Sequence, residues 1–101
     1  KGAQLENGLL HVDLVRRIVS VSGHEVKLSA KEYDLLRILI AHAGKVLTHG
    51  FLLKEVWGPA HVEDVQYLRV YIRQLREKLE AEPTRPNIIL TETGVGYRLQ
   101  T

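Results

Sequence analysis

The first part of the chain alternates between apolar and polar residues, as half-buried strands do. This period of two predicts short antiparallel strands, and it covers Leu9–Leu14, Arg17–Val21 and Glu25–Leu28. Asn7-Gly8 is a hairpin-turn dipeptide, so we expect a further short strand at 4–6 to pair with the next one. Residues 1–28 are therefore predicted to form a small packing sheet.

The pattern changes to a helical period after this sheet. Ser29 and Glu32 have the spacing of a capping box, in which the hydroxyl and the carboxylate satisfy backbone N–H groups at a helix start. Apolar side chains then recur along one helical face, at Tyr33, Leu35, Leu36, Leu39, Ile40 and Ala43. Gly44 marks the expected end of this helix. A second helix is predicted from its cap, Thr48, to about Trp57.

A third helix is predicted from about Asp64 to Glu82, ended by Pro83 and Pro86. Its core-facing residues fall within a narrow arc at 100° per residue, and they are Val65, Leu68, Ile72, Leu75 and Leu79. Val70 lies opposite this arc, so we expect it to be exposed. A hairpin should follow at 87–101. The order of small sheet, three helices over 29–82 and C-terminal hairpin predicts an α+β winged helix-turn-helix in a single domain, 1–101.

The composition is typical of one folded domain. The chain has 101 residues, of which 45% are hydrophobic and 26% charged, and it has no cysteine. Its longest apolar run, Ile38–Ala41, is too short for a membrane helix. The lack of cysteine fits a reducing cytoplasm, and the start at Lys1 without methionine suggests a piece of a longer protein. A net charge of only +2 means that a nucleic-acid hypothesis must rest on where the charges lie.

The outer face of the third helix carries side chains suited to a DNA major groove. Gln66, Val70, Gln74 and Glu77 lie opposite the apolar arc, with Arg73 and Tyr67 at the margins, and amides, arginine and an aliphatic group can each read base edges. The flanks hold side chains that could meet the phosphate walls, namely Arg69, Arg76, Tyr67 and Tyr71. The helix alone leaves an alternative open, a solvated amphipathic helix with the ion pairs Arg73–Glu77 and Arg76–Glu80.

Four sequence blocks, in this order, resemble the OmpR/PhoB-type winged-helix domain: Leu28–Leu36, Leu52–Gly58, Val70–Leu79 and Gly94–Arg98. Within that family, the chain is most similar to regulators of potassium-transport operons. The resemblance implies the DNA-binding effector half of a two-component response regulator. The receiver domain, which this chain lacks, would be phosphorylated by a sensor histidine kinase and promote a homodimer. The effector domains would bind tandem half-sites on double-stranded DNA and recruit RNA polymerase.

The resemblance also assigns roles to residues. Phosphate contacts would fall on Trp57 (through its indole N–H), Gln66, Tyr67, Tyr71, Arg73 and Arg76. Base-reading positions would be Arg69, Val70 and Gln74, and wing contacts Thr93, Tyr97 and Arg98. The polymerase-contact loop would be Gly58, Pro59, Ala60, His61, Val62 and Glu63. Some members have arginine in place of Thr93 at the wing tip, and others in place of Gln74, so the DNA sequence that is read should differ.

The residues also bear on two other function classes. An enzyme is disfavoured because the five histidines have no HxxxH or HxH spacing, there is no cysteine, and no Gly-rich phosphate loop precedes a helix. We therefore expect no catalytic residue, metal or cofactor. A winged-helix module that binds proteins and not DNA is the remaining alternative, and the arginines of the third helix favour DNA over it.

Overall fold

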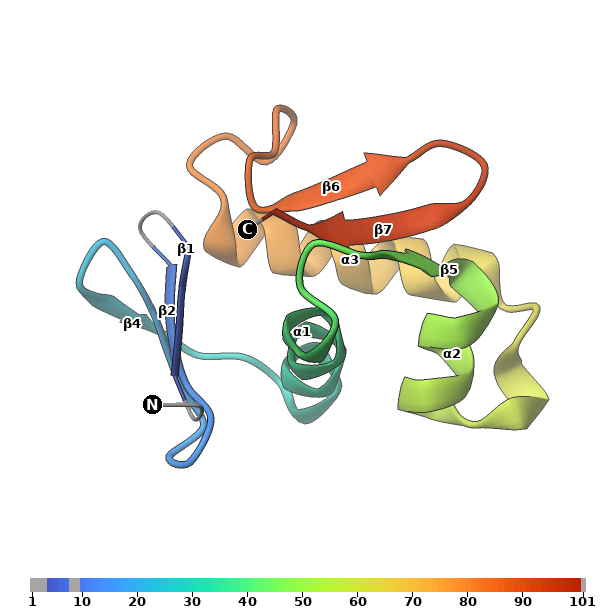
Figure 1. The fold of residues 1–101 in the computed structure, drawn as a ribbon, viewed down its shortest axis with the longest axis horizontal. Helices are drawn as coiled ribbons and strands as arrows, with labels where there is room; N and C mark the ends of the chain where they lie inside the picture. The colour runs from blue at the N-terminus through green and yellow to red at the C-terminus, as the bar shows by residue number, and fades with distance from the viewer. Residues whose placement is uncertain (1–3, 8–9, 101) are drawn as a thin grey trace.

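An antiparallel sheet of four strands opens the domain. The computed structural model describes residues 4–7 and 10–100. The strands are β1 (Gln4–Asn7), β2 (Leu10–Asp13), β3 (Ile18–Val21) and β4 (His24–Val26), hydrogen-bonded in chain order (Figure 1). This confirms the predicted N-terminal sheet. The expected turn at Asn7-Gly8 includes Gly8, which lies outside the described residues, but Asn7 does pair with Leu10.

Helix α1 (Ala30–Ala41) begins where the capping box predicted. The Oγ of Ser29 accepts a hydrogen bond from the backbone N–H of Glu32 (3.2 Å), and the Ser29 N–H donates to Oε1 of Glu32 (2.9 Å). The helix ends at Ala41, slightly before the predicted stop. Gly44 follows with φ +85°, a backbone conformation that favours glycine.

A second sheet of three strands has the order β5-β7-β6. It comprises β5 (Val46–Thr48), β6 (Ile89–Glu92) and β7 (Gly96–Leu99), all antiparallel. The β6–β7 hairpin was predicted, whereas β5 was missed. A three-residue strand is too short to show an alternation, and only its pairing with β7, far along the chain, defines it. This strand leads directly into α2 and so ties the wing to the helices.

Helix α2 (His49–Trp57) has the predicted cap, since Oγ1 of Thr48 accepts from the Phe51 N–H at 3.1 Å. A 3₁₀ turn, η1 (Pro59–His61), connects it to α3 (Val65–Leu79). Helix α3 ends at Leu79, three residues before the predicted end at Glu82. Glu80 leaves helical geometry, and its buried carboxylate accepts backbone hydrogen bonds from Asn87, Ile88 and Ile89 at 2.8–3.1 Å. This carboxylate, and not the prolines further on, marks the end of the helix.

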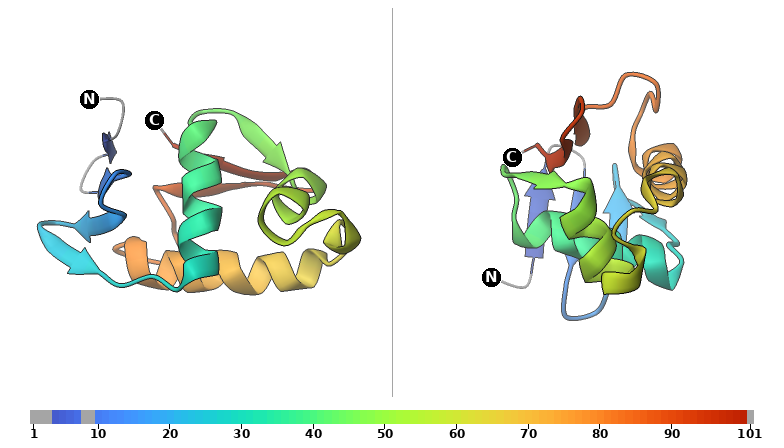
Figure 2. Two further views of the ribbon diagram at one scale, coloured as in Figure 1. Left: turned by 90° about the horizontal axis from the view of Figure 1, so that it is seen from below. Right: turned by 90° about the vertical axis from the view of Figure 1, so that its right-hand side faces the viewer.

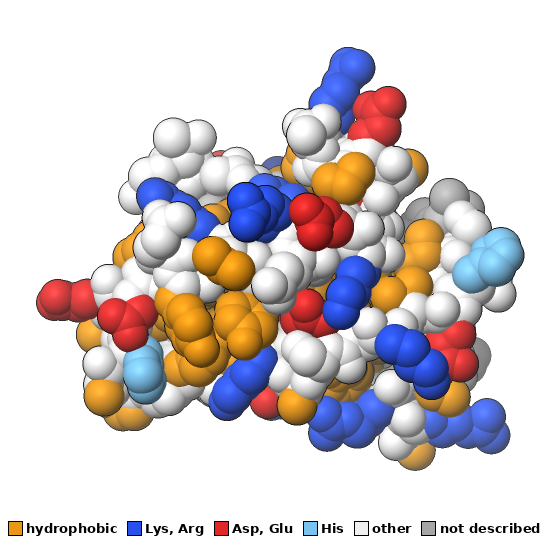
Figure 3. All heavy atoms as spheres, turned by 180° about the vertical axis from the view of Figure 1, so that it is seen from behind, with side chains coloured by type: hydrophobic (Ala, Val, Ile, Leu, Met, Phe, Trp, Pro, Cys, Tyr) orange, Lys and Arg blue, Asp and Glu red, His pale blue; other side chains and the backbone are white. Residues whose placement is uncertain are grey.

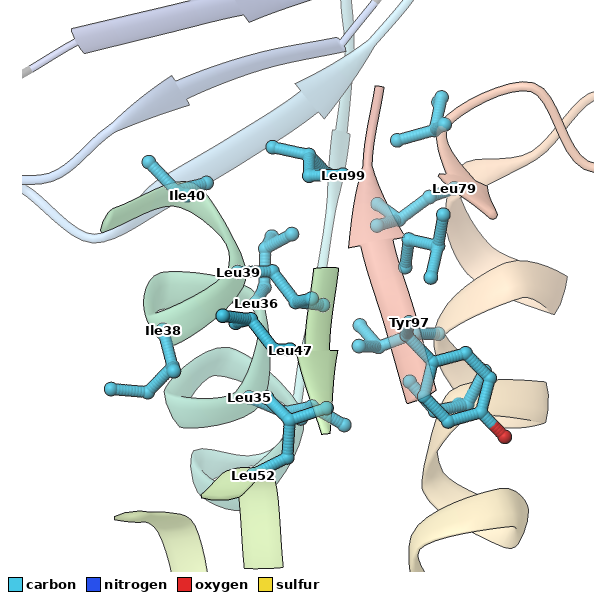
Figure 4. Close-up of a cluster of buried hydrophobic side chains, with 14 of the residues drawn as sticks. Leu35, Leu36, Ile38, Leu39, Ile40, Leu47, Leu52, Leu79, Tyr97 and Leu99 are labelled. Atoms are coloured by element: carbon cyan, nitrogen blue, oxygen red, sulfur yellow. The ribbon is translucent and has the colours of Figure 1, made fainter. Parts of the chain in front are cut away.

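The core lies between α1, the other helices and the second sheet, and buried side chains of β2 and β3 extend it. Helix α1 crosses α3 steeply, and α2 lies beside both (Figure 2). Leu36 and Leu39 of α1 point toward β5 and β7, where they meet Leu47 and Leu99 (Figure 4). Each of these side chains is at most 7% exposed. The core thus fixes α3 at the outer face of the domain while leaving its far side uncovered.

Candidate nucleic-acid interface

Helix α3 presents one buried side and one open side. Leu68, Ile72, Leu75 and Leu79 are at most 1% exposed, so the predicted core arc is confirmed for these residues, and Val65 is partly buried beside them. The helix lies along one edge of the molecule (Figure 2). The opposite side of α3 is therefore available to a partner.

The open side carries the predicted reading residues. Gln66, Arg69 and Arg73 are exposed, and Gln74 is partly exposed. Val70 is also only partly exposed, where full exposure was expected, although it is not part of the core cluster. Its position outside the core cluster agrees with the predicted helical phase.

The arginines on this side have no partner within the described part of the chain. Arg69 and Arg73 make no ion pair or hydrogen bond there, and the alternative pairs Arg73–Glu77 and Arg76–Glu80 are both absent among the described residues. The arginines on the open side of α3 are therefore not neutralised by carboxylates of the same helix. Two free guanidinium groups one turn apart are suited to bind phosphate or guanine.

An aromatic cluster forms one flank of α3. Trp57, Tyr67 and Tyr71 contact one another with ring centroids 5.0–5.4 Å apart. Hydrophobic side chains gather on this face over the end of α3 beside α2 (Figure 3). Burial raises the pKa of Tyr71, with the neighbouring Tyr67 as a second cause. The Tyr71 hydroxyl is protonated at neutral pH, as in any tyrosine whose pKa is ordinary or raised, and can donate a hydrogen bond.

The indole N–H of Trp57 is not where the resemblance implied. Its Nε1 atom is buried and has no hydrogen-bond partner within the described residues. Tyr67 and Tyr71 pack against the ring, and an enclosed N–H cannot reach a phosphate without a rearrangement of these side chains. In this structure Trp57 supports the two tyrosines.

Arg76 also departs from its expected position. Its guanidinium is turned toward the wing, where Nε and Nη2 donate to the carbonyl oxygen of Ile89 at 3.1 and 2.7 Å. The Nη2 atom also donates to Oγ1 of Thr91 at 2.8 Å, and the group lies 5.7 Å from the Tyr97 ring centroid. Burial lowers the pKa of Arg76, yet an arginine stays charged at neutral pH.

The wing residues divide into a buried part and an exposed part. Tyr97 is only 5% exposed, and its ring lies between β7 and α3 (Figure 4), so this predicted wing contact is a core residue. Gly96 and Leu99 of the same strand are buried as well, and only Arg98 of β7 is partly exposed. Nε of Arg98 donates to Oε2 of Glu92 at 3.1 Å. Thr93 is exposed at the tip beside Val95, which is 47% exposed and which sequence reasoning missed.

The loop between α2 and α3 is compact. Gly58 adopts φ +107°, and the backbone N–H of His61 donates to its carbonyl oxygen. Nδ1 of His61 lies 2.9 Å from Oδ2 of Asp64. Pro59, Ala60, Val62 and Glu63 are all exposed. A shallow hollow of about 730 Å³ adjoins the loop, and it is lined by Trp57, His61, Glu63, Asp64, Val65, Gln66 and Tyr67.

Neither a metal site nor a membrane-crossing helix is found among the described residues. Nowhere in 4–7 and 10–100 do three or more His, Cys, Asp or Glu side chains gather as metal ligands would. Over the same residues, no helix has both the length and the apolar character needed to cross a bilayer.

Comparison with known protein families agrees with this architecture. Residues 23–99 match the family described as "Transcriptional regulatory protein, C terminal". The chain belongs to this family. It is thus a winged-helix DNA-binding domain of the OmpR/PhoB type, from response regulators that control transcription, and the family is not one of enzymes.

The relatives of this chain include two differently named regulators, KdpE and RegX3. The chain is 51% identical over 87 residues to the KDP operon transcriptional regulatory protein KdpE of Escherichia coli strain K12, covering 86% of this chain and 39% of that protein. It is 43% identical over 97 residues to the sensory transduction protein RegX3 of Mycobacterium leprae, covering 96% and 49%. The chain therefore spans less than half the length of these relatives.

Solved structures share the fold closely. The response regulator DrrB of Thermotoga maritima, an OmpR/PhoB homologue, superposes with a TM-score of 0.87 at 31% identity, covering 98% of this chain and 45% of DrrB. The DNA-binding domain of RstA from Klebsiella pneumoniae, solved in complex with the RstA box, gives 0.85 at 33% identity, and the match covers 96% of each chain.

Proposed function

We propose that this domain binds specific DNA sequences with α3 in the major groove and the β6–β7 wing near the adjacent minor groove. The observation that carries the proposal is the open side of α3. Arg69 and Arg73 are exposed and unpaired within the described residues, and Gln66, Val70 and Gln74 lie beside them. Guanidinium groups and amides are the side chains that most often read base edges and phosphates. The RstA domain, which has the same fold, was solved on its own DNA box.

Base reading and phosphate binding are divided along the helix. We assign Arg69, Val70 and Gln74 to base edges, because Val70 and Gln74 lie one turn apart on the open side and Arg69 is the exposed residue next to Val70. Gln66, Arg73 and the hydroxyls of Tyr67 and Tyr71 are assigned to the phosphate walls. Thr93 and Arg98 contact the minor groove or its backbone.

The regulated genes are those of potassium transport. The support is the 51% identity to KdpE of Escherichia coli and the 46% identity to KdpE of Mycobacterium tuberculosis H37Rv. RegX3 proteins match at a lower identity, 42–43%, so the difference in identity favours the potassium assignment. It can be tested separately from DNA binding itself.

The remaining partners belong to the whole regulator. A receiver domain outside this chain accepts a phosphoryl group from a sensor histidine kinase in the cytoplasm and promotes a homodimer on tandem half-sites. The 58–63 loop contacts RNA polymerase. The hollow beside that loop supports this role, because exposed Glu63 and Asp64 would repel a phosphate backbone but suit a basic protein surface.

Selection of bound duplexes from a random DNA pool tests the proposal. We expect a recurring half-site and, in a full-length regulator, two copies in tandem about one helical turn apart. Binding should weaken steeply with salt, whereas a protein-interaction module would show neither a recurring site nor salt-dependent retention on heparin. Stronger binding to a duplex from the Escherichia coli KDP operon promoter than to a scrambled duplex would support the potassium assignment, and equal binding would contradict it.

A further inference from the structure

Arg76 is used differently from the other arginines of α3. Arg69 and Arg73 are exposed, whereas the Arg76 guanidinium is partly buried and makes three hydrogen bonds to β6. The acceptors are a backbone carbonyl, Ile89 O, and a side-chain hydroxyl, Thr91 Oγ1, two residues apart on the same strand. A planar fork that spans two such acceptors fixes direction as well as distance.

Apolar contacts and one carboxylate also join α3 to the wing, since Glu80, the residue after α3, accepts the N–H of Ile89 at the start of β6. Leu75 and Leu79 of α3 share the core with Ile89 of β6 and Leu99 of β7. Apolar packing holds these elements together but is not directional. The hydrogen bonds of Arg76 are directional, and unlike the one from Ile89 to Glu80 they extend along β6 from Ile89 to Thr91, toward the wing tip.

We propose that Arg76 is a positioning residue that sets the orientation of the wing relative to α3, and is not a phosphate contact. The inference rests on the proposed function, in which α3 and the wing touch one DNA duplex at two places. Both can engage together only if their relative orientation matches the distance between the grooves. Arg76 acts through β6, and its effect on DNA binding should therefore be seen at the wing.

Two conservative variants separate positioning from phosphate binding. Arg76→Lys keeps the positive charge but lacks the planar fork, and Thr91→Val removes one acceptor without changing any charge. Arg85→Lys and Thr84→Val, both at exposed positions between α3 and β6, serve as matched controls. Arg76→Ala completes the set, and thermal melting shows which variants stay folded.

Hydroxyl-radical footprints on a duplex selected with the unmodified chain give the decisive readout. We expect Arg76→Lys and Thr91→Val to lose protection at the wing flank, to keep it at the sites protected by α3, and to weaken affinity by about tenfold. The controls should match the unmodified chain. The inference is overturned if Arg76→Lys and Thr91→Val bind normally while Arg76→Ala weakens all protection evenly and lowers the salt slope by about one unit.

A measurement without DNA keeps the two proposals apart. Residual dipolar couplings of backbone amides report the orientation of β6 and β7 relative to α3 in the free chain. A changed orientation in Thr91→Val, with no duplex bound by the unmodified chain, would sustain the role of Arg76 and reject the proposed DNA function. An unchanged orientation in Arg76→Lys and Thr91→Val would reject the role of Arg76, whatever the DNA result.

Discussion

Nζ of Lys78 lies 2.6 Å from Oε1 of Glu32, and this contact joins the last turn of α3 to the first turn of α1. The Glu32 side chain is 4% exposed and also accepts the N–H of Ser29 in the capping box. Burial on its own would raise the pKa of Glu32, but the hydrogen bonds from Lys78 and Ser29 together lower it below its ordinary value. One carboxylate thus holds a helix start and the reading helix in place.

This pair predicts a loss of stability in acid. A carboxyl group with a lowered pKa in the folded state stabilises the fold above its unfolded pKa, and the contribution disappears as pH falls through the folded pKa. Glu32→Gln should therefore reduce the free energy of unfolding at pH 7 by about 1–3 kcal/mol, less than for a fully buried pair because Lys78 is 37% exposed. Urea unfolding at several pH values measures the effect.

The same experiment has a clear control. Glu77→Gln removes an exposed carboxylate of α3 that has no ion pair among the described residues, so it should change neither stability nor its pH dependence noticeably. The difference in stability between the unmodified chain and Glu32→Gln should shrink below about pH 4. A difference that stays constant from pH 7 to pH 3 would show that Glu32 acts through packing and not through its charge.

Neighbouring positions on α3 should give opposite phenotypes. Ile72 is 1% exposed, so Ile72→Ala should cost about 2–5 kcal/mol of stability through a core cavity. Gln74→Ala should leave the melting temperature nearly unchanged and reduce discrimination at one base pair by roughly 1–3 kcal/mol if its contact is bidentate. Val70→Ala should relax a preference for thymine, with a small stability cost because Val70 is partly covered.

Thermal melts and binding curves on single-base variants of the selected duplex separate these classes. If Val70→Ala melted as early as Ile72→Ala, the reading side of α3 would have to be reassigned. If Gln74→Ala weakened binding to every duplex equally, Gln74 would be a phosphate contact and not a base reader.

Local patterns predicted most of the fold, and long-range contacts account for what was missed. The capping box at Ser29 and the apolar arc of α3 depend on residues a few positions apart, so both could be found in the sequence. The Lys78 partner of Glu32 is 46 residues away, and β5 exists only through its pairing with β7. Side-chain direction was least predictable, because Arg76 turns toward β6 and Tyr97 into the core only once the wing has folded back.

Two glycines of the wing should respond very differently to alanine. A Cβ atom at Gly96 would lie 1.8 Å from the carbonyl oxygen of Leu47 and 2.9 Å from the Cα of Thr48. Both are backbone atoms: Thr48 is the N-cap of α2, and Leu47 precedes it in β5. Moving either atom would disrupt the β5–β7 pairing or the start of α2. Gly96→Ala should separate β5 from β7 and cost more than about 3 kcal/mol, or prevent folding.

Gly94 is the matched control for this prediction. A Cβ there meets no atom within 4 Å, but φ is +77°, so Gly94→Ala should cost only about 1–2 kcal/mol from backbone strain. Urea unfolding followed by circular dichroism measures the free energy of unfolding of both variants. Equal losses would mean that the close approach of β5 and β7 does not limit the size of residue 96.

The ion pair in the wing should restrain DNA binding. Nε of Arg98 donates to Oε2 of Glu92 at 3.1 Å, and both side chains are partly exposed. A phosphate that binds Arg98 must compete with this carboxylate, which also repels the DNA backbone. Glu92→Gln should therefore strengthen binding to selected and scrambled duplexes alike, by about threefold to tenfold at low salt, and steepen the salt slope by about one unit.

Glu82→Gln removes an exposed carboxylate between α3 and β6 and is the control. A Glu92→Gln variant that binds both duplexes no more tightly than Glu82→Gln would show that Arg98 stays away from the phosphates, and the wing contact would then fall to Thr93 and its neighbours at the tip.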